Sequence, residues 1–280
     1  MIWLGLAIMI VSEAATLAGI EPFASWNTPI CWTGFIVFAD AIVFRARGDS
    51  WIRSAPREFA ALAAVSIPLW VVFEGYNLII RNWYYTGLPE NTALRLFGYA
   101  WSFATIWPAI FEAAELFAVM RRTDANCNGV GSPLQTARGK RLPTPLQLVG
   151  AAMLVAPFFV SDAIAPYLAA SVWLGFILLL DPINDRFGAE SIAGDLRRGR
   201  GWDRTINLIL SGFLCGILWE FWNYWSRAKW HYTVPIMARL KIFEMPVPGY
   251  LGFPAFALEC FTMYVCVRRL VTKHGRTIGL

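Results

Sequence analysis

Two carboxylates with matching neighbours are the residues of this chain best suited to chemistry. Glu220 is followed by Asn223, and Glu74 is followed by Asn77 at the same spacing. Residues i and i+3 share one face of a helix, so each carboxylate and its amide should point into the same space. Aromatic residues that could wall a cavity stand around both pairs: Trp83, Tyr85, Trp219, Trp222, Trp230 and Tyr232.

Carboxylic acids among aromatic faces in a dry space suit reactions that pass through a carbocation. An acid protonates an alkene, Trp and Tyr faces stabilise the cation, and a carboxylate or amide then removes a proton. In this hypothesis Glu74 and Glu220 are the acid and base, and Asn77 and Asn223 orient them. The same residues also suit binding of a long apolar ligand without chemistry, or hydrogen bonds that bridge helices.

Other carboxylates have weaker signals. Glu112 and Glu259 lie deeper in apolar segments, and a buried, protonated acid can either serve as a general acid or donate an interhelical hydrogen bond. The sequence leaves both open. Asp40 and Asp181 stand before arginines at segment ends, which favours interfacial ion pairs. Glu13 has no counterpart, and we expect it to face other helices.

The composition places these residues in a membrane. Of the 280 residues, 57% are hydrophobic and 15% are charged, whereas soluble domains carry about 25% charged residues. The fold class expected is all-α, a polytopic membrane protein with about eight transmembrane helices. The apolar segments approach the length needed to span hydrocarbon: Ile2–Ile20, Thr28–Phe44, Ala60–Ile80, Phe97–Met120, Leu146–Ile164, Tyr167–Leu180, Thr205–Tyr224 and Tyr250–Val271. A tight turn is expected at Ala165-Pro166.

Positive charges predict the orientation of these segments. Most of the 24 Lys and Arg residues fall after the second, fourth, sixth and eighth segments. Lys and Arg collect in cytoplasmic loops, so both termini are predicted to be cytoplasmic, in an inner or plasma membrane. The chain starts without a recognisable cleavable signal peptide.

The two halves of the chain match each other. Trp32, Gly34 and Asp40 align with Trp173, Gly175 and Asp181, and Glu74-x-x-Asn77 aligns with Glu220-x-x-Asn223. Matching polar residues in matching spans predict a duplication of two parallel four-helix repeats, 1–122 and 146–280, joined by a cytoplasmic linker, 123–145. Parallel repeats are related by an axis along the membrane normal, and substrate sites often lie at their interface.

Several functional classes find no support. The five cysteines form no CxxC pair, and there are only two histidines, which argues against a histidine-rich metal site. No phosphate-binding loop is visible, so we expect no cofactor, no metal and no nucleic-acid partner. The expected partners are the lipid bilayer and an apolar small-molecule or lipid ligand. Gly212 and Gly216 form a small-xxx-small face that could pack within the chain or in a homo- or hetero-oligomer.

One family shares the order of these motifs. Glu220 is followed by Trp230-His231-Tyr232 and then by the Pro-containing segment Phe243–Phe253, and Glu74 is followed by Trp83-Tyr84-Tyr85 and Phe97-Gly98-Tyr99. This order resembles the heterodimeric-type lycopene cyclases of carotenoid biosynthesis, whose small multi-helix domains work as pairs and are sometimes fused. The family places paired acids and Phe-Phe after its Pro, where this chain has Pro248-Gly249. The resemblance implies the fold and the pairing of halves; Glu244 or Glu259 would have to supply the missing acid.

Three functional hypotheses therefore remain. The first is a membrane enzyme of cyclase or isomerase type acting on an isoprenoid or other lipid-like substrate. The second is a non-enzymatic membrane subunit that binds a lipid or pigment. The third is a transporter that uses the intramembrane carboxylates as a proton relay.

Overall fold

The chain folds into long helices with a small strand ribbon at one end. A computed structural model describes residues 1–123, 144–272 and 275–280; Cys127 and most of the predicted linker 123–145 lie outside these residues. The first half contains α1 (Ile2–Leu17), α2 (Phe23–Arg47), α3 (Trp51–Ser54), α4 (Pro56–Ile80), β1 (Trp83–Thr86) and α5 (Thr92–Arg121). The second contains α6 (Pro145–Val155), α7 (Ala169–Arg186), α8 (Ile192–Arg197), α9 (Asp203–Trp225), β2 (Lys229–Tyr232) and α10 (Gly252–Val271).

Six of the described helical segments are long and apolar enough to cross a membrane. They are Phe23–Arg47, Pro56–Ile80, Thr92–Arg121, Ala165–Arg186, Asp203–Trp225 and Val247–Val271. The first and fifth predicted spans instead form shorter apolar helices, Ile2–Leu17 and Pro145–Phe158. The helix at the second predicted span is longer than predicted. It begins at Phe23 and continues through Trp26, whose backbone angles are not helical.

Local sequence explains where several helices begin and end. Asn91 accepts the backbone N–H groups of Ala93 and Leu94 and so caps α5, as short polar side chains do at helix starts. Thr144 and Gln147 form a reciprocal capping box at α6. That helix ends at Val155 rather than at the predicted Ile164, because Pro157 follows and the chain tightens into a 3-10 turn at Ala156–Phe158. A second 3-10 turn, Ala165–Leu168, precedes α7.

Glycines allow two helix pairs to approach closely. A Cβ on Gly5 or Gly34 would clash across the α1–α2 contact, and one on Gly150 would meet the backbone of Gly175 and Leu178 across the α6–α7 contact. Small residues at such crossings let two backbones pack together in an apolar environment. Gly212 and Gly216 do the same within the chain, since a Cβ on either would overlap Phe253 of α10. Their small-residue face therefore packs against α10.

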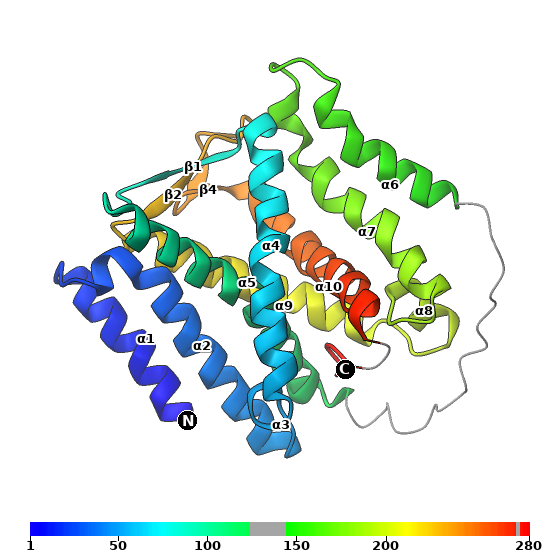
Figure 1. Ribbon diagram of the computed structural model, residues 1–280, viewed down its shortest axis with the longest axis horizontal. Helices are drawn as coiled ribbons and strands as arrows, with labels where there is room; N and C mark the ends of the chain where they lie inside the picture. Colours follow the sequence, from blue (N-terminus) through cyan, green and yellow to red (C-terminus); the bar gives the residue numbers. More distant parts are fainter. Residues whose placement is uncertain (124–143, 273–274) are drawn as a thin grey trace.

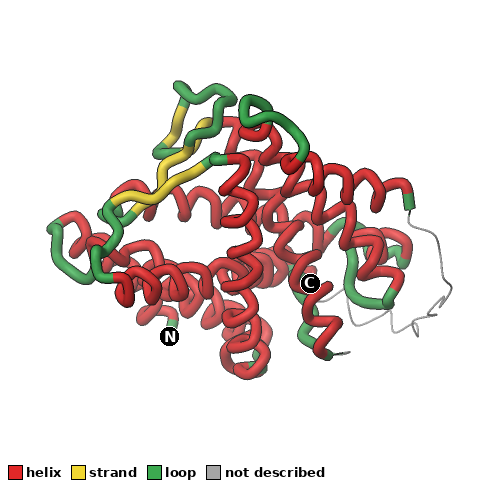
Figure 2. Tube along the Cα trace, turned by 45° about the horizontal axis from the view of Figure 1, so that its top comes forward, coloured by secondary structure: helices red, strands yellow, loops and turns green. Residues whose placement is uncertain are grey.

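A two-stranded ribbon joins the halves. β1 and β2 pair antiparallel, with Trp83 opposite Tyr232 and Tyr85 opposite Trp230. A second small pair, β3 (Lys241–Ile242) and β4 (Met245–Pro246), follows β2. The sequence did not predict these strands. Both pairs lie at one end of the molecule, while the N-terminus, α3, α8 and the C-terminus lie at the opposite end (Figure 1; Figure 2 shows the ribbon over the helices).

The apolar core is built around α2, α4, α5, α9 and α10. Its largest fully buried side chains include Trp51, Trp107, Phe111 and Phe261. At the end opposite the ribbon, a buried charged cluster replaces apolar packing. Arg204 is buried and lies 2.8 Å from Glu190 and 2.9 Å from Asp195. Buried charges are usually paired in this way, because an unpaired charge is costly to desolvate.

Candidate functional site

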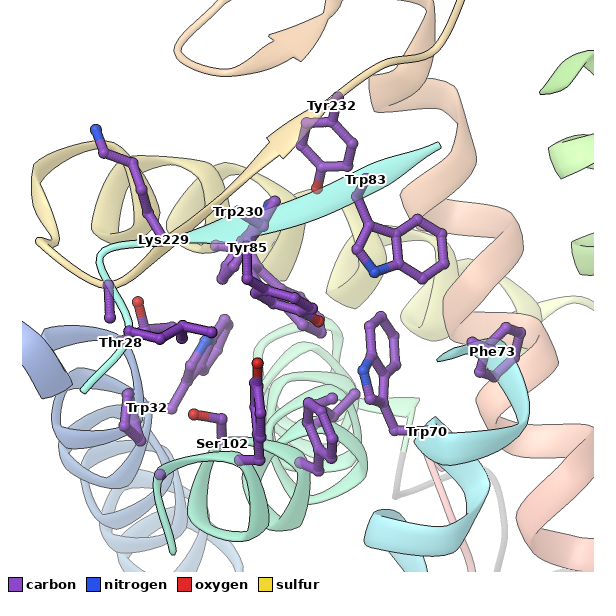
Figure 3. A pocket seen from close by; sticks show the side chains of 18 of the residues that line it. Thr28, Trp32, Trp70, Phe73, Trp83, Tyr85, Ser102, Lys229, Trp230 and Tyr232 are labelled. Carbon is purple, nitrogen blue, oxygen red and sulfur yellow. The ribbon is translucent and has the colours of Figure 1, made fainter. Parts of the chain in front are cut away.

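A cavity lies directly beneath the ribbon, where the two halves meet. It encloses about 150 Å³, and the empty space reaches about 1250 Å³ when the part that is open to the outside is counted. Ligand pockets for small molecules commonly measure about 300–1,000 Å³, so a ligand of ordinary size would also occupy the part of the cavity that is open to the outside. Figure 3 shows the side chains of both strands and of α2, α4 and α5 converging on it.

Aromatic residues make up half of those that line the cavity. The aromatic residues that line it are Trp26, Trp32, Trp70, Phe73, Trp83, Tyr85, Tyr99, Phe103, Trp173, Trp219, Trp230, Tyr232, Phe253 and Phe256. Trp70 of α4 and Trp219 of α9 meet at the centre with ring centroids 6.0 Å apart, and Phe256 packs edge-on against both. Rings at such separations and angles attract one another beyond simple burial. The wall is therefore predominantly apolar.

Strand alternation places the ribbon's aromatic residues in this wall. Successive side chains of a strand point to opposite faces, so Trp83 and Tyr85 face the cavity together with their partners Trp230 and Tyr232. The opposite face carries His231, whose Nδ1 lies 3.0 Å from Glu244 and whose Nε2 lies 3.1 Å from the Thr86 hydroxyl. His231 and Glu244 thus do not line the cavity.

Glu74 lies behind this wall. Its Oε1 accepts hydrogen bonds from Trp70 Nε1 at 2.8 Å, Trp83 Nε1 at 3.2 Å and the Tyr85 hydroxyl at 2.6 Å. All three donors belong to residues that line the cavity, whereas Glu74 does not. Burial, with the nearby Glu74 charge, raises the pKa of the Tyr85 phenol well above its usual value, so it remains a proton donor.

Glu220 occupies the corresponding place behind β2. The Tyr232 hydroxyl donates to its Oε1 at 2.8 Å. Its Oε2 is buried and has no hydrogen-bond partner among the described residues. Burial, and then the Glu220 charge, raises the pKa of the Tyr232 phenol well above its usual value. Each glutamate therefore reaches the cavity through a tyrosine hydroxyl.

The two asparagines hold the strands rather than the carboxylates. Asn77 Nδ2 donates to Trp83 O at 2.8 Å, and its Oδ1 accepts the N–H groups of Asn82 and Trp83. Asn223 brackets Trp230 in the same way, donating to its carbonyl and accepting its N–H, both at 2.9 Å. These bonds satisfy backbone groups where a helix ends and a strand begins. The asparagines orient the tryptophans of the wall.

The deep pair, Glu112 and Glu259, lies away from the cavity. Both side chains are almost completely buried, at 1% and 0% exposure. Neither lines the cavity, and no carboxyl oxygen of either has a hydrogen-bond partner within the described part of the chain. The structure does not bring them together with Glu74 and Glu220.

The remaining predicted residues are placed as follows. Trp222 does not line the cavity; it packs perpendicular to Trp32 with centroids 4.8 Å apart. Asp40 accepts the backbone N–H of Ile52 at 2.8 Å, and Asp181 accepts those of Ile192 at 2.7 Å and Ala193 at 2.9 Å. Each aspartate therefore accepts hydrogen bonds from the start of a short helix, a partner that the sequence did not reveal. Glu13 accepts from Asn27 of α2 at 3.0 Å and so faces a neighbouring helix, as expected.

Several cavity residues were missed by the sequence interpretation. Trp70 stands four residues before Glu74, which is the spacing of neighbours on a helix face, and this could have revealed it. Trp32 and Trp173 were matched by the repeat but not assigned to the site. Phe256 and Arg95 carry no comparable local signal, because tertiary packing alone brings their helices to the cavity. Among the described residues, no group of three or more His, Cys, Asp or Glu side chains is placed to hold a metal ion.

Comparisons with known proteins identify no relative. The chain matches no protein-family model, no curated protein and no solved structure.

Proposed function

We propose that this chain is an integral membrane protein whose aromatic cavity binds a long apolar ligand, such as an isoprenoid or another lipid-like molecule. One observation carries this proposal: fourteen aromatic side chains line a cavity that no carboxylate lines. Such a wall excludes water and offers mainly dispersion contacts and π faces, which suit a long hydrocarbon chain.

The membrane architecture is part of the same proposal. Eight helices would form two parallel four-helix repeats, with the short helices α1 and α6 completing the bundle and both termini cytoplasmic. Matched contacts support the duplication: Glu74–Tyr85 and Glu220–Tyr232, and the two asparagines that bracket Trp83 and Trp230. The antiparallel ribbon pairs the two equivalent strands with each other, as expected for elements related by a two-fold axis.

Mass spectrometry of the co-purified lipids tests the binding proposal. We expect the full chain, purified in mild detergent, to carry an apolar ligand that Ser102→Phe displaces, because Ser102 lines the cavity and a phenyl ring would fill it. Ala93→Phe is the matched control, since Ala93 is exposed near the start of the same helix. Equal ligand content in all three proteins would contradict the proposal.

A catalytic role of cyclase or isomerase type is the second candidate. The Glu220–Tyr232 and Glu74–Tyr85 hydrogen bonds favour it, because each connects a carboxyl group to a phenol at the cavity wall. An acid would add a proton to one carbon of an alkene, and a base would remove a proton from another carbon after ring closure or bond shift. No atom is gained or lost, so substrate and product have the same mass.

The enzyme hypothesis and the binding hypothesis predict different bound ligands in the Glu220→Gln variant. For an isomerising enzyme, the variant should retain a ligand of the wild-type mass but different chromatographic retention, because the precursor is bound and not converted. For a binding protein, both proteins should carry the same compound. An identical ligand in wild type and Glu220→Gln would therefore rule out catalysis through Glu220.

A further inference from the structure

The charged side chains that line the cavity are few and all basic. Among the described lining residues, Arg95 and Lys229 carry a full charge, and the acids Glu74 and Glu220 lie behind the wall. A charge beside an apolar cavity is poorly hydrated and gains most from a partner. A ligand can therefore add an anionic partner only to a cation that has none within the protein.

The ammonium group of Lys229 already has partners within the protein. Its ammonium donates to the Tyr224 carbonyl at 2.8 Å and lies 3.9 Å from Glu244. It also lies 5.3 Å from the centre of the Tyr224 ring, within cation–π range. Figure 3 shows the end of this side chain pointing away from the cavity. The aliphatic part of Lys229 therefore lines the cavity, while its ammonium group points to the outside.

Arg95 is placed differently. It lies half-buried in the first turn of α5 and lines the cavity. Within residues 1–123, 144–272 and 275–280, its guanidinium makes no ion pair and no hydrogen bond. Arginine offers five donors in a planar fork that matches the oxygens of a carboxylate or phosphate. An unpaired guanidinium facing an apolar cavity is suited to an anionic group.

The cavity continues from Arg95 along one face of α5. The lining residues of this helix are Arg95, Gly98, Tyr99, Ser102, Phe103 and Ile106. Their spacing of three and four residues defines a single stripe. At 1.5 Å per residue, the stripe from Arg95 to Ile106 measures about 16 Å. At its far end, Phe73 and Phe256 close the wall with purely apolar rings.

We propose that the cavity selects amphiphiles with one anionic end, which Arg95 binds while the apolar chain lies along the α5 stripe. The oxyanion is that of a lipid carboxylate or a lipid phosphate. This inference rests on the proposed function, because it requires that the cavity hold an apolar chain. It also gives the orientation of the bound ligand: the charged end lies at the start of α5, and the chain points toward Ile106 and Phe256.

Binding of a fluorescent fatty acid tests the inference. The probe is cis-parinaric acid, and its methyl ester keeps the same chain without the charge. With the full chain in neutral detergent, we expect Arg95→Gln to weaken binding of the acid about tenfold, since a charge-assisted hydrogen bond is lost. Binding of the ester should change less than twofold. Arg239→Gln is the matched control, because Arg239 is exposed and does not line the cavity.

Competitors identify the source of the oxyanion. Displacement of the acid by octadecyl phosphate, lost in Arg95→Gln, supports recognition of phosphate as well as carboxylate; displacement by palmitate alone supports a carboxylate site. Equal displacement by uncharged octadecanol would overturn the inference. Arg95→Lys keeps the charge without the fork, and should retain part of the preference for acid over ester.

The two proposals can fail separately. If acid and ester bind wild type equally, and Ser102→Phe abolishes both, the anionic preference is wrong and the apolar cavity stands. If neither probe binds wild type, both proposals are wrong. Circular dichroism of each variant must match that of wild type, so that loss of binding reports on the cavity.

Discussion

Glu74 and Glu220 stand in equivalent places behind the two strands, yet their surroundings differ. Three aromatic donors converge on Oε1 of Glu74. Glu220 accepts a hydrogen bond from Tyr232 on one oxygen, and its other oxygen is buried without a partner among the described residues. The first carboxyl group is thus well satisfied, and the second is not.

A single position accounts for much of this difference. Four residues before Glu74 stands Trp70, which donates one of the three hydrogen bonds. Four residues before Glu220 stands Gly216, which has no side chain to donate, and Phe253 of α10 packs against it. The α9–α10 contact therefore takes the space that an indole would need.

This contrast assigns different roles to the two sites. Hydrogen bonds from several donors stabilise a carboxylate and fix the rings that donate them, so Glu74 primarily holds Trp70, Trp83 and Tyr85 in the wall. A buried polar atom without a partner destabilises the fold, and such atoms cluster where function requires them. If either carboxyl group exchanges a proton with a ligand, we expect it to be Glu220.

Replacing each glutamate by leucine gives the largest expected difference. Glu74→Leu leaves three aromatic donors without their acceptor and should lower the free energy of unfolding by about 3 kcal/mol, at about 1 kcal/mol for each donor. Glu220→Leu leaves the Tyr232 hydroxyl without its acceptor and also removes an unsatisfied oxygen, so a loss of about 1 kcal/mol is expected. Titration of the purified protein with a denaturing detergent, followed by circular dichroism, measures both.

Glu21→Leu controls for the loss of a surface carboxylate. Glu21 pairs with Arg227 where both side chains are about half exposed, at 46% and 56%, and such pairs contribute little. A larger loss in Glu220→Leu than in Glu74→Leu would reverse the assignment of roles.

The sequence predicted the helical architecture well because apolar length is a local property. The bounds of α4 and α9 agree with their predicted spans to within a few residues, since Pro56, Asp203 and the polar residues that follow each helix are visible in the sequence. The ends of α6 and the start of α2 were less predictable. There, α6 stops at the 3-10 turn Ala156–Phe158, which contains Pro157, and α2 is kinked at Trp26.

Only part of the candidate site could be read from the sequence. Repetition of Glu, Asn and Trp-x-Tyr brought out Glu74, Glu220 and the strand aromatics, and the structure gathers these around one cavity. It did not show that the glutamates stand behind the wall, because strand pairing decides which side chains face inward. Trp222 was singled out for its proximity to Glu220, but proximity along a helix does not fix direction, and it packs against Trp32.

The tyrosines should show the opposite ranking from the glutamates. Tyr232→Phe removes the hydrogen bond that Glu220 accepts and should lower the free energy of unfolding by about 2 kcal/mol, because the carboxyl group is fully buried. Tyr85→Phe leaves Glu74 with two indole donors, Trp70 and Trp83, so we expect about 1 kcal/mol or less. The same detergent titration measures this pair. Equal losses would mean that the two carboxyl groups are equally well satisfied.

Alkaline pH should affect both sites in the same direction, with the smallest difference between them. Burial raises the pKa of Tyr85 and Tyr232 well above the usual value of about 10. Above pH 10 the unfolded chain therefore loses these protons while the native state keeps them, so the free energy of unfolding falls as pH rises. Each tyrosine contributes at most about 1.4 kcal/mol per pH unit.

Single Phe variants separate these contributions. Tyr85→Phe and Tyr232→Phe should each make the decline between pH 10 and pH 11 less steep, and the double variant should make it shallower still. Tyr84→Phe, on the outer face of the ribbon, controls for removal of a hydroxyl group outside the cavity. A double variant as steep as wild type would show that these phenols do not stay protonated in the native protein, and it would remove the proton donor that connects Glu220 to the cavity.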